Sequence, residues 1–383
     1  MNVPPPPNRQ HSLGNSRGFF VPGGNMTAIT ALDLFAGTGW GVACRRLGIR
    51  EMGVEIMPEA IATRDANGMA TIYRDVWDGL DGKFHVPEHQ LLIASPPCQT
   101  FSLAGKGSGR QALNEVLEAI DLHTYKEPTR LREFGERHDP RTALVLAPLA
   151  HIWRDRPQMV VLEQVPTVLP VWHAYAEAMT DWGYSVTVGL LNAEQYGVPQ
   201  TRKRAILVAK LDGMAAMPTP THSRYYSNNP SKLDPGVKKW VSMGEALGLS
   251  DFTAEKVMGK GMVERYGKRP GRDAHAPAFA IRASAGGMEP GGFVLRSNYG
   301  TGGDSSKRGE RTINQPAATL TSKADRMKWD GVRRLTAEEA SALQSYPEGF
   351  TWTGKKFLQI GNAVPPLMAH AILAALIGIT EGR

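Results

Sequence analysis

Cysteine is scarce in this chain of 383 residues, which contains only Cys44 and Cys98. Two thiols cannot form a disulfide framework or a cysteine-based zinc site, and this scarcity predicts a reducing compartment. No stretch approaches the ~18 apolar residues of a membrane span. Residues 1–27 lack the apolar core of a secretory signal and are rich in Pro, Gly, Asn and Ser. We therefore expect a disordered tail there, and a cytoplasmic protein with no membrane partner and no metal.

Acidic residues are in the minority, with 37 Asp and Glu against 44 Lys and Arg. The basic excess is concentrated between residues 211 and 330, where 18 Lys and Arg accompany 12 Asp and Glu. A local basic surplus is typical of a protein that binds a polyanion, although a solvated surface gives the same count. Charge therefore suggests a nucleic-acid partner without identifying it.

Short apolar runs alternate with helix-length amphipathic segments from about residue 28 to residue 209. This alternation predicts βαβ units and a Rossmann-like, doubly wound mixed α/β sheet. The expected strands cover residues 29–35, 50–56, 91–95, 159–165, 184–192 and 204–210. Near Met214 the sequence becomes rich in Gly and Pro, which predicts a smaller module that is irregular or rich in β-structure.

Regular structure is predicted again near residue 333. Thr336 and Glu339 have the S/T-x-x-E spacing of a capping box, which predicts the start of a helix. The chain then ends in an apolar helix that begins at Pro365 and Pro366 and needs a large core to cover. We therefore expect a discontinuous first domain, residues 28–209 plus 333–383, with residues 210–332 inserted as a second domain.

A glycine-rich turn follows the first expected strand, in the stretch from Phe35 to Gly41. Such a turn lets backbone approach a nucleotide cofactor at a helix N-terminus. It is not the G-x-G-x-x-G motif of a dinucleotide site, because Val42 stands at the third glycine position. Glu55 stands at the end of the second expected strand, and Asp75 stands where the end of a further strand would present a carboxylate. Either acid alone is equally well explained as a solvated side chain, but together with the turn they favour an adenosine-type cofactor.

Cys98 lies just after the expected strand 91–95, where the ligand crevices of open α/β sheets occur. Pro96 and Pro97 restrict the backbone before it, so the thiol is held on a stiff support. The polar, glycine-bearing residues 99–109 suit a mobile flap. A buried structural cysteine is the common alternative, but it does not account for these three features together. The pattern favours a nucleophilic thiolate.

Three further charged residues are candidates for the same crevice. Glu163 stands at the end of another expected strand, where an acid can lie near Cys98. Arg202 and Arg204 are two positions apart at the start of the next one, so we expect them on one face. Paired guanidinium groups suit phosphate or carboxylate binding, although charges that protect a sheet edge are the ordinary alternative.

The order of these motifs resembles that of the DNA (cytosine-5)-methyltransferase family. The resemblance covers about residues 29–377 and rests on blocks that occur in the family's order: DLFAGTGW, VEI, DVWDG, SPPCQTFSLAG, LEQV, YGVPQTRKR, RRLT…YPEGF and QIGNAVPP. It implies methyl transfer from S-adenosyl-L-methionine to carbon 5 of a cytosine in double-stranded DNA. Cys98 would attack carbon 6 and Glu163 would hold or protonate N3, with Arg202 and Arg204 as further catalytic residues.

The resemblance also implies binding residues and partners. Cofactor contacts would come from Phe35, Gly37, Glu55, Asp75, Pro97, Gly39, Ile56, Val76, Asn362 and Val364. DNA contacts would come from Gln99, Ser102, Gln200, Thr319 and Leu320. The target cytosine would be flipped out of the duplex, and residues 210–332 would recognise the target sequence. A bacterial or phage-type, nucleoid-associated monomer is expected, and a restriction endonuclease is a candidate functional partner.

Two features depart from the family pattern. The usual Glu-Asn-Val is Glu163-Gln164-Val165 here, and the longer Gln164 side chain could shift a hydrogen bond that supports the Pro-Cys loop. The segment 111–140 is longer than in compact members, and its apolar spacing predicts an inserted helix.

Four other functions explain the sequence less well. An RNA cytosine methyltransferase of the same architecture is the nearest alternative, and the long basic insertion favours duplex DNA over it. A DNA-binding regulator without activity is disfavoured by the retention of Cys98, Glu163 and the two arginines. An adenine amino-methyltransferase would need an Asp- or Asn-Pro-Pro-aromatic loop, which Ser95-Pro96-Pro97-Cys98 does not supply. A nicotinamide dehydrogenase would need the third glycine.

Overall fold

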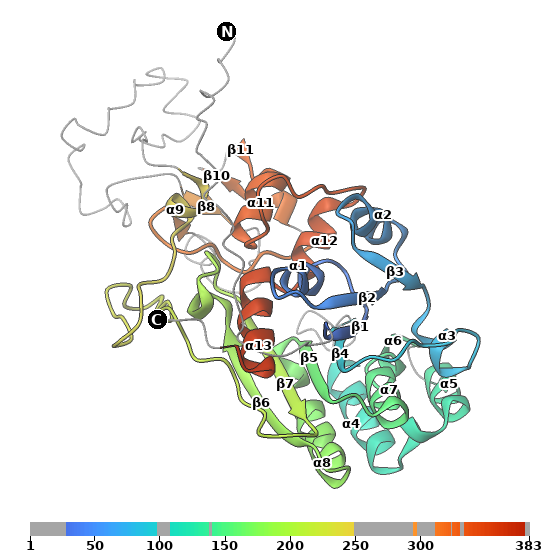
Figure 1. Ribbon diagram of the computed structural model, residues 1–383. Coiled ribbons are helices and arrows are strands. Elements are labelled where there is room, and N and C mark those ends of the chain that lie inside the picture. The colour runs from blue at the N-terminus through green and yellow to red at the C-terminus, as the bar shows by residue number, and fades with distance from the viewer. Residues whose placement is uncertain are drawn as a thin grey trace, which may run out of the picture.

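A seven-stranded sheet forms the centre of the computed structural model, which describes residues 28–97, 108–137, 140–248, 294–296, 311–322, 324–329 and 333–379 (Figure 1). The strand order is β3-β2-β1-β4-β5-β7-β6. The strands are β1 (Thr30–Leu34), β2 (Arg50–Val54), β3 (Ala70–Tyr73), β4 (Leu91–Ala94), β5 (Met159–Gln164), β6 (Ser185–Asn192) and β7 (Lys203–Lys210). Strand β7 runs antiparallel to both of its neighbours, β5 and β6, and the other pairs in this sheet are parallel. The Rossmann-like mixed α/β sheet predicted from the sequence is confirmed.

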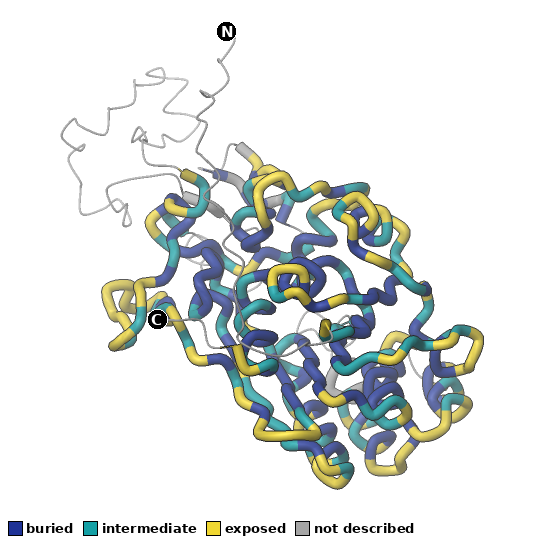
Figure 2. The backbone as a smooth tube through the Cα atoms, viewed as in Figure 1, coloured by how far each residue is buried: buried dark blue, intermediate teal, exposed yellow. Residues whose placement is uncertain are grey.

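Both faces of this sheet are covered, which explains why its strands read as nearly continuous apolar runs. All four residues of β4 are fully buried. Leu92 belongs to one apolar cluster and Leu91 and Ile93 to another, because alternate strand residues point to opposite faces. Figure 2 shows the same pattern, with buried strands inside and exposed loops outside.

Helices from distant parts of the sequence pack on the two faces. The helices up to β7 are α1 (Gly39–Arg46), α2 (Pro58–Ala66), α3 (Val76–Leu80), α4 (Ser108–Asp121), α5 (Pro128–Arg137), α6 (Pro140–Ala143), α7 (Ala147–Asp155) and α8 (Leu169–Asp181). Short 3-10 turns are η1 (Thr124–Lys126), η2 (Pro166–Val168) and η3 (Ala193–Tyr196). The predicted inserted helix is confirmed as α4, and Val116 and Ile120 bury it in the core of the sheet domain.

The C-terminal helix α13 (Pro366–Ile377) packs beside α1 (Figure 1). It is apolar on all sides, and Met368 and Ile372 are fully buried in the same cluster as Trp40. The stretch Lys356–Ile377 is long and apolar enough by composition to cross a membrane, which the sequence analysis overlooked. Its most apolar window is 67% buried inside the protein, as expected for a core helix.

A second, smaller sheet has the order β11-β10-β8-β9. Its strands are β8 (Val294–Arg296), β9 (Arg311–Thr312), β10 (Lys328–Trp329) and β11 (Arg333–Arg334), and the remaining helices are α9 (Met243–Leu247), η4 (Ala324–Arg326), α11 (Ala337–Leu343) and α12 (Lys356–Asn362). The predicted capping box at the start of α11 is confirmed. Trp329 and Ile360 share an apolar cluster with Val42 of α1, so the two sheets are joined by packed side chains. The exact domain limits stay a prediction, and the expected tail over residues 1–27 lies outside the described residues.

Close packing at Gly361 joins α12 to the end of the inserted segment. A Cβ atom on Gly361 would overlap the backbone of Thr321 and Ser322. Backbone cannot move aside as the end of a flexible side chain can, so only glycine fits at this position.

We therefore expect Gly361→Ala to lower the free energy of unfolding by about 1–3 kcal/mol, the usual cost of overpacking, although alanine is the better helix former. Urea denaturation followed by circular dichroism measures this change. Gly189→Ala is the matched control, because a Cβ there meets only the terminal carbon of Met217 at 3.7 Å. Equal stability of the two variants would contradict the close packing at Gly361.

Candidate active site

The functional candidates converge at one edge of the large sheet. Strands β1, β2, β4 and β5 are parallel, so their carboxyl ends lie side by side at this edge. Strand β7 runs the other way and therefore begins where β5 ends, with Ala205 opposite Gln164. This register brings residues at the start of β7 next to residues at the end of β5.

Glu163 and Arg204 form an ion pair across this boundary. The Nε atom of Arg204 lies 2.8 Å from Oε1 of Glu163, and both side chains are largely buried, with exposed fractions of 12% and 7%. A second guanidinium nitrogen of Arg204 donates to the carbonyl oxygen of Lys203 at 2.8 Å. The carboxylate of Glu163 is thus held in one orientation by a guanidinium group that is itself fixed.

Arg202 lies before the start of β7 and has different partners. Its guanidinium group is buried and donates to the carbonyl oxygens of Leu320, Gly361 and Ala363 at 2.8 to 3.0 Å. These bonds connect the large sheet to the inserted segment and the C-terminal block. The shared face expected for the two arginines does not give them a shared partner: Arg204 binds Glu163, and Arg202 binds backbone.

Gln200 and Leu320 lie in the same junction and are fully buried. The side-chain oxygen of Gln200 accepts a hydrogen bond from the backbone N–H of Leu320 at 2.8 Å, and its amide nitrogen donates to the side chain of Gln344. Neither side chain offers exposed surface to a duplex, so their expected DNA contacts stay predictions. Thr319 is exposed, and its hydroxyl donates to the carbonyl oxygen of Thr201 at 2.6 Å.

The loop after β4 is supported from β5. The side-chain amide of Gln164 donates to the carbonyl oxygen of Pro96, and its side-chain oxygen accepts from the backbone N–H of Val165. The hydroxyl of Ser95 accepts a hydrogen bond from the indole nitrogen of Trp40 at 2.9 Å. Gln164 therefore makes the contact to the Pro-Cys loop that its greater length put in question. Cys98, Gln99 and Ser102 lie outside the described residues, as does most of the expected flap.

The glycine turn after β1 lies against Glu55, which follows β2. One carboxylate oxygen of Glu55 accepts from the backbone N–H of Gly37 at 2.9 Å and the other accepts from Met57 at 2.8 Å. Gly37 has a positive φ of 48°, and a Cβ placed on it would meet no described atom within 4 Å. Ile56, beside Glu55, is 64% exposed, unusual for so large an apolar side chain. The turn thus offers open space, acceptor oxygens and an apolar surface together, which are features of small-molecule sites.

The structure also describes the other residues predicted to contact the cofactor. Asp75 caps α3 and accepts from the backbone N–H of Trp77 at 3.0 Å. Phe35 has a positive φ of 60°, rare for a residue with a side chain, at the start of the turn. Val364 packs its backbone against Gly39, where a Cβ would overlap it. The remaining candidates are Pro97, half-buried after β4, Val76, buried at the start of α3, and Asn362, exposed at the end of α12.

A family model for the C-5 cytosine-specific DNA methylases matches residues 29–129 and 134–378. The chain belongs to this family. It is 26% identical over 373 residues to the type II methyltransferase M1.HphI of Haemophilus parahaemolyticus, with 91% of this chain and 87% of that protein covered. It is also 26% identical to the type II methyltransferase M.AplI of Arthrospira platensis, with 93% and 87% covered. The Dnmt2 methyltransferase of S. pombe has a similar fold, with a TM-score of 0.51, 14% identity and coverage of 91% of this chain and 98% of that one.

The structure also contains a buried cluster of charged side chains that was not predicted from the sequence. Asp33, Glu51 and Arg64 lie beneath the glycine turn and are almost completely buried. The sequence does contain a sign of this cluster, because charged residues lie inside or beside apolar strands, as Asp33 does in TALDL. Cys44 is buried nearby, and burial raises the pKa of its thiol well above the usual range. In this DNA methylase Cys44 is thus a poor nucleophile.

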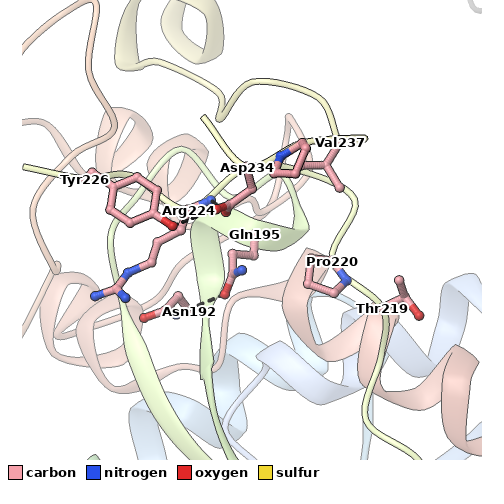
Figure 3. Close-up of a pocket in the computed structure, with 9 residues that line it drawn as sticks. Asn192, Gln195, Thr219, Pro220, Arg224, Tyr226, Asp234 and Val237 are labelled. Carbon is pink, nitrogen blue, oxygen red and sulfur yellow. Dashed lines mark hydrogen bonds between the residues drawn. The ribbon is translucent and has the colours of Figure 1, made fainter. Parts of the chain in front are cut away.

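Two adjoining cavities lie beyond the end of β6. The larger one has a volume of about 430 Å³ and lies between Asn192 and the loop that contains Asp234 (Figure 3). Within this loop the hydroxyl of Tyr226 donates a hydrogen bond to the carboxylate of Asp234 at 2.6 Å. The smaller one, about 240 Å³, shares Asn192 and Arg224 with it. Its other lining residues are Glu194, Thr201, Arg202, Lys203, Tyr225, Ser227, Arg311 and Thr319. The smaller cavity is therefore rich in basic side chains and opens next to the predicted DNA contact at Thr319.

The support that Gln164 gives to the Pro-Cys loop can be tested in this methylase. Gln164→Leu removes the donor to Pro96 and leaves a buried carbonyl oxygen unpaired, which costs about 1–3 kcal/mol. We expect single-turnover methyl transfer to slow by about tenfold to a hundredfold, while affinity for duplex DNA stays the same. Gln158→Leu, at the exposed opposite end of β5, is the control. An unchanged rate in Gln164→Leu would show that the loop does not depend on this bond.

Proposed function

We propose that the chain methylates carbon 5 of a flipped-out cytosine in double-stranded DNA through a covalent bond between Cys98 and carbon 6. The ion pair of Glu163 and Arg204 at the end of β5 is the observation that carries this proposal. It supports the proposal because a buried carboxylate, fixed in orientation, is what the ring nitrogen N3 of cytosine needs as a partner.

The reaction begins when the thiolate of Cys98 adds to carbon 6. The new carbon–sulfur bond pushes the electron pair of the 5,6 double bond onto carbon 5, and negative charge spreads toward N3. Glu163 holds or protonates N3 and so stabilises the ring as charge builds. Arg204 engages Oε1 of Glu163, and we assign the contact with N3 to Oε2.

The second half of the reaction restores the ring. S-Adenosyl-L-methionine would supply an electrophilic methyl group and leave as S-adenosylhomocysteine, and the residues that would hold it are Glu55, Ile56, Asp75 and the glycine turn. Once carbon 5 has gained the methyl group, a base removes the proton from carbon 5. The electron pair of that carbon–hydrogen bond reforms the double bond, and the thiolate of Cys98 leaves.

The covalent step has a direct test. Duplex DNA and labelled S-adenosyl-L-methionine should yield labelled 5-methylcytosine with the wild type, and Cys98→Ser should lower the rate by about a thousandfold or more. Glu163→Gln should bind DNA and transfer slowly, because an amide cannot deliver a proton. DNA with 5-fluorocytosine should trap the wild type covalently, since fluorine at carbon 5 blocks the last proton removal. Transfer by Cys98→Ser at the wild-type rate would refute the mechanism.

Duplex DNA, rather than RNA, is proposed as the substrate. The names of the type II methyltransferase relatives and the basic lining of the smaller cavity support this choice. A restriction endonuclease as functional partner and residues 210–332 as the target reader are part of the same proposal. Competition between tRNA and duplex DNA for methyl transfer distinguishes the two substrates, and sequencing the modified bases in cells that express the protein identifies the target.

The smaller cavity is proposed to contact the DNA backbone. Replacing Lys203 and Arg224 with Gln should weaken duplex binding and reduce the salt slope of the affinity by about one for each lost phosphate contact. Fluorescence anisotropy at several salt concentrations measures this slope. Arg46→Gln, at the end of α1 and the opposite edge of the sheet, is the control. An unchanged slope in the double variant would place the DNA elsewhere.

A further inference from the structure

Arg64 of α2 lies completely buried beneath the glycine turn, although arginine is rarely buried unless it is paired. Its guanidinium group is 2.7 Å from the carboxylate of Glu51 on β2. It also donates to the hydroxyl of Thr71 at 3.0 Å and to the carbonyl oxygen of Ala70 at 2.6 Å. The guanidinium group also donates a hydrogen bond to the carbonyl oxygen of Gly37, in the glycine turn, at 2.9 Å.

The sequence provides the space for this arginine. Gly53 lies in the middle of β2, and a Cβ there would overlap the guanidinium group of Arg64. Strand interiors disfavour glycine, so its presence at this position is explained by the side chain that lies over it. Arg64 can therefore reach from α2 across β2 to the turn.

Gly37 is held from both sides as a result. Its N–H donates to Glu55 at 2.9 Å and its carbonyl oxygen accepts from Arg64 at 2.9 Å. We propose that Arg64 is a positioning residue for the cofactor, acting through Gly37 to hold the turn and Glu55 in the arrangement that receives S-adenosyl-L-methionine. This inference rests on the proposed function, because it assigns a role toward the cofactor of that same site.

The charges of the buried group are consistent with this role. Burial raises the pKa of Asp33 well above its usual range, and the nearby carboxylate of Glu51 raises it further. Burial raises the pKa of Glu51 as well, but its pairing with Arg64 lowers it, so we infer that a proton taken up by the two acids goes first to Asp33. Asp33→Asn, which mimics a protonated carboxyl group, should then leave cofactor binding unchanged, whereas Glu51→Gln should weaken it.

The test compares Arg64→Lys with wild type in the full-length protein. Lysine keeps the charge beside Glu51, but a single ammonium group cannot reach Gly37, Ala70 and Thr71 together. We expect calorimetry to show about tenfold weaker binding of S-adenosylhomocysteine, with unchanged affinity for duplex DNA. In turnover assays KM for S-adenosyl-L-methionine should rise by a similar factor while kcat stays the same. Arg50→Met, an exposed arginine on β2, is the control and should bind as wild type does.

The outcomes separate this inference from the proposed function. If wild type fails to bind S-adenosylhomocysteine, the proposed function itself is wrong. If wild type binds and Arg64→Lys binds equally well, the positioning role is overturned while the proposed function stands. If cofactor affinity, DNA affinity and melting temperature all fall together, Arg64 serves folding in general and the inference is likewise overturned. A loss confined to the cofactor supports it, and Asp33→Asn then provides a second, independent check.

Discussion

The antiparallel register between β5 and β7 is the constraint on which the ion pair of Glu163 and Arg204 depends. In a purely parallel sheet, the residues at the start of a strand lie at the opposite edge from the residues at the end of its neighbour. Reversing β7 brings Arg204 to the edge where Glu163 ends β5. A buried carboxylate needs such a partner, because an unpaired charge away from water is costly. The fold thereby supplies the orientation that the proposed chemistry requires.

The glycine turn, where we propose that the cofactor binds, depends on charged side chains that are buried beneath it. A turn with positive φ at Phe35 and Gly37 is held only if its polar groups have partners. Glu55 supplies one from the surface of the site, and Arg64 supplies the other from beneath. Arg64, unlike Glu55, is completely buried and has no surface that a ligand could contact. In both places a fixed guanidinium group orients a neighbouring polar group: Arg204 orients Glu163, and Arg64 orients Gly37.

The C-terminal block completes the domain rather than following it. Arg202 donates to the carbonyl oxygens of Leu320, of Gly361 in α12 and of Ala363 just after α12. Val364 packs on Gly39 at the start of α1. The chain leaves the large sheet at Lys210, opposite the start of β5, and the bond from Arg202 to Leu320 holds the later part of the segment before α11 against the site end of the sheet.

The sequence by itself determined six of the seven strands of the large sheet, the turn, the capping box at Thr336 and the order of motifs that resembles the methylase family. Periodicity and local spacing are properties of neighbours in the chain. The sequence also identified Glu163 and Arg204 as candidates, but not their pairing. Only the tertiary structure decided that Arg204 binds Glu163 while Arg202, two residues away, binds backbone. Only the tertiary structure revealed Arg64 under Gly37, because contacts between residues distant in sequence depend on how the strands are registered and which side chains share a face.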